Sequence, residues 1–170
     1  MAVAAREPLV REIRLTWWRE QIAALVAAGE PPAQPTLQAL ADVVRRGAPA
    51  ALFEALIDAH VDAIEGPPER AAEAVERALM RLAAAALDPV AADAPAIAPA
   101  ARAWALRNTP GQGRAVTAAL AEARAAGGLS VTAFPAVAHA TMARAYVKGR
   151  EPSPLARRLR LTAAVLTGRL

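Results

Sequence analysis

The chain contains no cysteine among its 170 residues, which excludes thiol catalysis, zinc–thiolate sites and a disulfide framework. Histidine is nearly as scarce, because His60 and His139 are far apart and neither belongs to a metal-ligand pattern such as HxxxH. We expect structural roles for both. Serine occurs only as Ser130 and Ser153, each at an expected helix start, so a serine nucleophile has no supporting residues.

A long run of bulky apolar residues is also missing. The longest charge-free stretch, between Arg124 and Arg144, is interrupted by glycines, a serine, a proline and a histidine. We do not expect it to span a membrane. Residues 1–7 contain no apolar core of signal-peptide length before the first charges, so we expect no export.

Aromatic residues make up 4% of the chain, and positive charge is nearly all arginine, with a net charge of +4. This balance suits an anionic partner only weakly, because a GC-rich genome produces the same arginine bias. Nucleic-acid binding is not expected, since aromatic residues are not interleaved with the arginines. The glycines at 111–113 and 127–128 follow no expected strand, which leaves nucleotide binding without support.

Proline and glycine, by contrast, are frequent and placed where helices begin and end. No stretch shows the sustained alternation of a strand, so we predict an all-α chain forming a single helical domain. On the first helix Val10, Ile13, Trp17, Ile22 and Leu25 are expected near one face, and on the fourth Val75, Leu79 and Leu82 are expected to turn inward. Helices are predicted at residues 8–28, 36–46, 49–65, 69–87, 100–107, 114–126 and 130–148, with a last one from Ser153.

Three carboxylates are spaced along one side of the third predicted helix. Asp58 and Asp62 stand at i and i+4, and Glu65 follows one turn later. Such a group can share Mg²⁺, which prefers oxygen ligands and commonly bridges carboxylates to a diphosphate. An exposed acidic helix edge has the same spacing, so the pattern leaves both interpretations open.

Three segments of the chain are informative together. They are Glu12–Glu20, which contains the adjacent Trp17 and Trp18, then Phe53–Asp58, and the end of the chain from Arg158. Together these segments resemble the squalene/phytoene synthase family, in particular its divergent, truncated proteobacterial branch, similar to the type that assists assembly of respiratory complex I. The resemblance implies an isoprenoid (terpenoid) synthase-like helical fold. Residues 1–170 would form one such domain, lacking the family's N-terminal helices.

The resemblance also implies roles for individual residues. The family's first aspartate-rich motif would lie upstream of the Trp17–Trp18 helix, and the second would fall near residues 104–114, which contain no acid. We therefore expect a non-catalytic binding or assembly role without a cofactor. The alternative is a prenyl-diphosphate transferase of isoprenoid biosynthesis, using Mg²⁺ at Asp58, Asp62 and Glu65 or at a site completed by another subunit. The residues expected to line a substrate channel are Trp17, Trp18, Phe53, Ile57 and Val61.

The last predicted helix is basic and amphipathic, with Arg157, Arg158 and Arg160 among leucines. Such a helix can meet a diphosphate or lie on an anionic membrane, although a solvated face of a core helix has the same pattern. We expect an isoprenoid diphosphate or lipid as ligand and a homodimer or partner protein covering an apolar face. The expected location is the cytoplasm, with peripheral contact to the inner membrane.

Overall fold

The structure, a computed structural model, describes residues 6–27, 31 and 33–170, without the side chains of residues 6, 7, 65 and 69. All regular structure in these residues is helical, so the predicted all-α class is confirmed. Most predicted helices are found within a few residues of their expected bounds. They are α1 (Arg6–Val26), α2 (Pro35–Arg45), α3 (Ala50–Glu65), α4 (Pro68–Leu87), α5 (Ile97–Ala105), α6 (Gly113–Ala126), α7 (Ala143–Tyr146) and α8 (Pro154–Thr167), with short 3₁₀ turns η1 (Pro89–Ala91), η2 (Leu106–Asn108), η3 (Phe134–Ala136) and η4 (Ala138–Met142).

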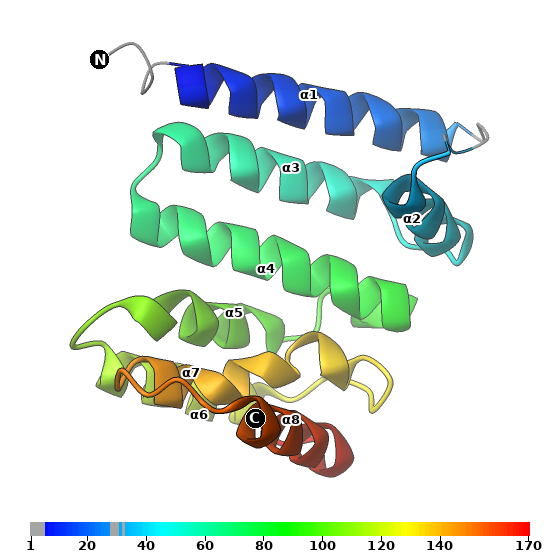
Figure 1. The fold of residues 1–170 in the computed structure, drawn as a ribbon. Helices are drawn as coiled ribbons and strands as arrows, with labels where there is room; N and C mark the ends of the chain where they lie inside the picture. The colour runs from blue at the N-terminus through cyan, green and yellow to red at the C-terminus, as the bar shows by residue number, and fades with distance from the viewer. Residues whose placement is uncertain (1–5, 28–30, 32) are drawn as a thin grey trace.

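The longer helices are stacked in chain order (Figure 1). Helix α1 packs on α3, α3 on α4, α4 on α5 and α5 on α6, while α2 lies across the ends of α1 and α3. Helix α8 lies at the opposite end of the stack from α1 and packs on η4. No helix of the described residues is long and apolar enough to cross a membrane.

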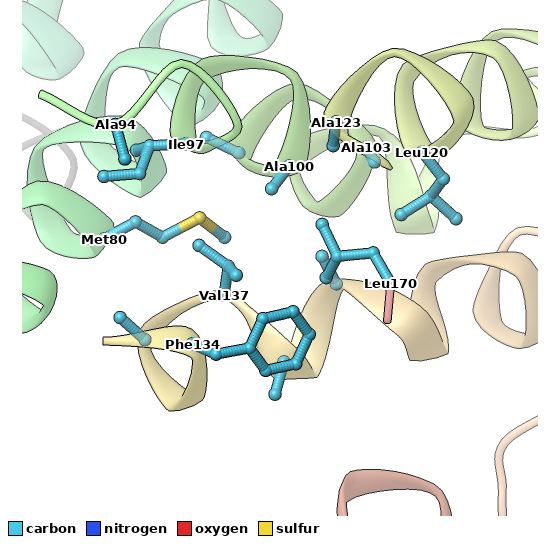
Figure 2. Close-up of a cluster of buried hydrophobic side chains, with 14 of the residues drawn as sticks. Met80, Ala94, Ile97, Ala100, Ala103, Leu120, Ala123, Phe134, Val137 and Leu170 are labelled. Atoms are coloured by element: carbon cyan, nitrogen blue, oxygen red, sulfur yellow. The ribbon is translucent and has the colours of Figure 1, made fainter. Parts of the chain in front are cut away.

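The main core lies between α4, α5, α6 and the η3–η4 segment. Figure 2 shows Met80 beside Val137, and Leu120 farther along the same layer near Leu170, all within one cluster. Helix α5 lies at the centre, and its Ala100 and Ala103 are fully buried. Because alanine is small, neighbouring helices can approach α5 closely on several sides.

Smaller clusters join the first three helices. Ile22 of α1 packs with Phe53 and Ile57 of α3, and Leu25 packs with Leu37 of α2. Helix α2 begins with proline, whose fixed φ suits a first turn. The buried residues of α1 therefore lie in its second half, and Leu15 and Trp18 pack at the edge of the same cluster.

Two predicted burial patterns are confirmed only in part. On α1, Ile22 and Leu25 are buried, whereas Val10, Ile13 and Trp17 are exposed because α1 is the terminal helix of the stack. On α4, Val75 is half-buried and Leu82 packs against two of the smaller clusters, but Leu79 is 46% exposed although it was expected to turn inward. Helix α4 packs against α3 on one side and α5 on the other, so a single apolar face does not describe it.

Residues 130–148 do not form the single helix predicted for them. The segment divides into η3, η4 and the short α7. The Ser130 hydroxyl accepts a hydrogen bond from the Ala133 N–H (3.2 Å) and donates one to Asp88 (2.6 Å), which anchors the start of the segment. Pro135 then removes a backbone donor. Val137 and Ala140 are fully buried, so the segment follows the shape of the core instead of one helical period.

Candidate functional site

An open groove lies between α1, α2 and α3. Its volume is about 410 Å³, and its walls are mainly apolar side chains. Arg11 and Arg14 of α1 and His60 of α3 contribute the charged and polar groups at its edge. The groove therefore combines an apolar interior with cationic side chains. The apolar residues that line it are Leu15, Trp18, Ile22, Leu40, Phe53, Leu56 and Ile57.

Adjacent positions on α1 place the two tryptophans in different surroundings. Their rings meet edge to face, with centroids 4.9 Å apart and planes at 74°. Trp18 is half-buried and lines the groove, whereas Trp17 is 40% exposed and lies outside the groove lining. Successive helical residues are about 100° apart, so two neighbours cannot both face α3.

Of the residues predicted to line a channel, Trp18, Phe53 and Ile57 are brought together in the groove. Trp17 lies outside it, and Val61 lines a separate surface hollow. Four apolar residues of the lining were not predicted: Leu15, Ile22, Leu40 and Leu56. Leu15 stands at i−3 from Trp18 on the same helix face, which was the available signal for it.

The first carboxylate of the predicted metal group already has a cationic partner. Arg19 of α1 donates a hydrogen bond from Nε to Oε2 of Glu54 (3.0 Å) and another from Nη2 to Oδ1 of Asp58. Since Glu54 and Asp58 are one turn apart on α3, one guanidinium spans both and ties α1 to α3. The Asp58 carboxylate thus faces an arginine of its own chain.

No contact among the described residues brings the other two predicted ligands, Asp62 and Glu65, next to Asp58. Asp62 lines the hollow that also contains Val61 and Glu12. The side chain of Glu65 lies outside the described residues, so the complete trio remains a prediction. Among the described residues, no group of three or more histidine, aspartate or glutamate side chains is placed to hold a metal ion.

Residues 2–73 match the family model described as squalene/phytoene synthase. Over this segment, which is less than half of the chain, the sequence is similar to the squalene/phytoene synthases. The match spans α1, α2 and α3 and enters α4, so it contains every residue that lines the groove. The family has the helical isoprenoid synthase-like fold, in agreement with the all-α structure. No match was found among curated proteins or among solved structures.

A second group of aromatic side chains, which the sequence did not reveal, surrounds Trp104 of α5. His139 and Tyr146 each meet its ring edge to face, with centroids 4.9 Å and 5.7 Å away. The Arg107 guanidinium lies 4.3 Å from the ring centre and is paired with Glu76 (3.2 Å). The spacing of His139 and Tyr146, two helical turns apart, could have indicated a shared face, but not that this face meets Trp104.

The pKa of His139 is held below its ordinary value of 6.5, chiefly because the ring is buried and secondly because Arg107 is nearby. Below pH 6.5 the unfolded chain binds a proton that the folded chain resists, so stability falls as the pH drops from about 6.5 through the lowered folded pKa. We expect the melting temperature of the wild type to fall more between pH 7.5 and pH 5 than that of His139→Gln. Equal falls in calorimetric scans of the two proteins would contradict this.

The three arginines predicted to contact an anion are separated by the structure. Arg157 is paired with Glu151 (3.2 Å), and Arg158 is exposed. Arg160 lines a hollow between α8 and the segment that contains η4 and α7.

Proposed function

We propose that the chain binds an isoprenoid chain or another lipid tail in the groove between α1, α2 and α3 and does not condense prenyl diphosphates. The groove is the observation that supports this proposal most directly. Small-molecule sites commonly measure about 300–1,000 Å³ with mostly apolar walls, and the groove fits this description at about 410 Å³. Arg11 and Arg14 at its edge would face the polar end of an amphiphilic ligand.

The surroundings of Asp58 support the non-catalytic part of the proposal. Ionisation of an allylic diphosphate needs cations that stabilise the departing diphosphate, and carboxylates usually hold those cations. Here Arg19 is already paired with both Asp58 and Glu54, and a divalent cation would compete with it for Asp58. The transferase alternative therefore requires Asp58 to exchange this partner for Mg²⁺, together with Asp62 and Glu65 or ligands from another subunit.

The test is calorimetric titration of farnesyl diphosphate into the wild type, with and without Mg²⁺. We expect saturable binding without Mg²⁺ and the same affinity in the double variant Asp58→Asn/Asp62→Asn. Trp18→Ala should weaken binding about tenfold or more, because a ring that covers the apolar ligand is lost. Trp17→Ala is the matched control and should stay within about twofold of the wild type, since Trp17 lies outside the groove.

Three results would contradict the proposal. Equal weakening by Trp17→Ala and Trp18→Ala would show that the groove is not the site. Binding that requires Mg²⁺ and is lost in Asp58→Asn/Asp62→Asn would favour the transferase. If farnesyl diphosphate does not bind to the wild type, the groove proposal fails and the assembly role is the one that remains. If Trp18→Ala does not fold by circular dichroism, Leu56→Asp places a charge in the groove wall at a half-buried position and answers the same question.

For the assembly role, we propose that a second copy or a partner protein covers the outer face of α1. Leu9, Val10, Ile13 and Trp17 recur there at helical spacing and are all exposed. A monodisperse monomer in sedimentation at micromolar concentration would argue against self-association. We further propose a cytoplasmic location with peripheral contact to the inner membrane.

A further inference from the structure

Helix α8 lies at the other end of the stack (Figure 1), and together with the segment around α7 it borders an open hollow of about 470 Å³. Among the described residues that line it, five are cationic and none is acidic, and the remainder are alanines and threonines. This hollow lies outside the part of the chain that matches the family model. The five cationic residues are Arg144, Lys148, Arg150, Arg160 and Arg169.

These cations reach the hollow from three segments. Arg144 and Lys148 stand one turn apart at α7 and its end, and Arg160 shares a face of α8 with Ala164 and Thr167. Gly168 closes α8 with φ of +61°, a left-handed conformation that suits glycine, and Arg169 follows it into the wall of the hollow. The positive charge is therefore gathered by the fold, not by sequence proximity alone.

The cationic groups of the hollow are not paired with carboxylates. In the part of the chain that the structure describes, none of the five lies within 4.0 Å of an aspartate or glutamate oxygen, whereas the nearby Arg157 is paired with Glu151. The Nε of Arg144 is buried and has no hydrogen-bond acceptor, and the same holds for the Nε of Arg157 outside the hollow. A buried donor without an acceptor is costly, so a shift of the Arg144 side chain toward an anion in the hollow would stabilise the folded chain.

The hydroxyl groups in the wall are already engaged. Thr141 donates to the carbonyl of Ala138 (2.8 Å), and Thr167 donates to that of Ala163 (2.7 Å). Recognition in the hollow therefore depends on the guanidinium and ammonium groups. Guanidinium groups form paired, charge-assisted hydrogen bonds with phosphate oxygens.

We propose that this hollow binds a phosphate or diphosphate group. Cations from residues 144–150 and from residues 160–169 can contact such a group together, as the arginines of a single helix face could not. Both a soluble diphosphate and the headgroup of a phospholipid present phosphate oxygens of this kind. The site goes beyond the function proposed for the groove, and neither site depends on the other.

The first experiment titrates inorganic pyrophosphate into the full chain by calorimetry, without divalent cations. We expect saturable binding at one site per chain. Arg160→Gln should weaken it by about fivefold or more, because one charge-assisted contact is lost. Arg158→Gln is the matched control: it removes the same charge from the same helix, but position 158 is about 200° around the helix from 160 and lies outside the hollow. Its affinity should stay within about twofold of the wild type.

Absence of saturable binding would overturn the proposal, and so would equal weakening by Arg158→Gln and Arg160→Gln, which would indicate general attraction to a basic chain. Arg144→Gln tests the buried donor, and because its folding is less assured, the exposed Arg160 carries the decision. Trp18→Ala should leave pyrophosphate binding unchanged, so failure of the groove proposal and failure of this one are distinguishable.

Vesicles distinguish the two sources of the phosphate. Phosphatidylcholine vesicles containing phosphatidic acid are sedimented with the wild type and with Arg160→Gln. Binding that Arg160→Gln weakens and pyrophosphate displaces would support the proposal with a lipid headgroup as ligand. Saturable pyrophosphate binding without vesicle binding would support it with a soluble ligand. Vesicle binding that neither the variant nor pyrophosphate alters, together with no pyrophosphate binding, would overturn it.

Discussion

Met80→Ala should lower the free energy of unfolding by about 2–5 kcal/mol, the usual range for truncating a fully buried side chain of this size. Met80 is 1% exposed and lies where α4 meets α5 and the η3–η4 segment. Its neighbours include many alanines, which are too short to fill the space that the thioether leaves. The cavity should therefore persist. Urea unfolding followed by circular dichroism measures the effect.

Leu79→Ala provides the control for this substitution. Leu79 precedes Met80 on α4 and is 46% exposed, so its truncation should cost less than about 1 kcal/mol. A loss for Leu79→Ala as large as that for Met80→Ala would show that α4 is rotated from the orientation described.

Phe53→Ala should cost about 3–5 kcal/mol, because Phe53 is 3% exposed and fills the cluster between α1, α2 and α3. The same ring forms part of the groove wall, so its loss should also enlarge the groove. Thermal unfolding monitored by circular dichroism gives the loss of stability. It should be measured before any ligand titration, so that unfolded protein is not mistaken for weak binding.

Val61→Ala on the same helix is the comparison for Phe53→Ala. Val61 is 39% exposed and lies outside the cluster, so we expect a loss below about 1 kcal/mol. Equal losses would mean that the α1–α3 cluster contributes little to the stability of the chain.

The helices were predictable because proline and glycine mark most of their ends. Pro35 begins α2, Pro68 begins α4 and Gly168 ends α8, each by a local effect on φ or on a backbone donor. The orientation of each helix was less predictable. Leu79 and Ile13 have the apolar character of core residues, but burial depends on which neighbours a helix meets, and α1, at the end of the stack, meets α3 on one side only.

The candidate sites also combine features that the sequence indicates with features that depend on the tertiary arrangement. Trp18, Phe53 and Ile57 were predicted from a resemblance and do meet in the groove, whereas Trp17 differs from Trp18 only in its direction around α1. The C-terminal hollow was only partly anticipated. Arg160 was named as an anion contact, but its proximity to Arg144 depends on α8 folding back onto η4, which no local pattern encodes.

The chain-order stacking of α1, α3, α4 and α5 has a consequence for how the molecule forms. Each of these helices can dock on one already made. Helix α4 follows α3 after two residues, and α3 follows α1 after the short α2, so the connections to be closed are local and their entropic cost is small. During synthesis the groove helices can associate before α8 has left the ribosome. The basic hollow must wait for the final residues of the chain, so the apolar site can exist on a nascent chain that does not yet have the anionic one.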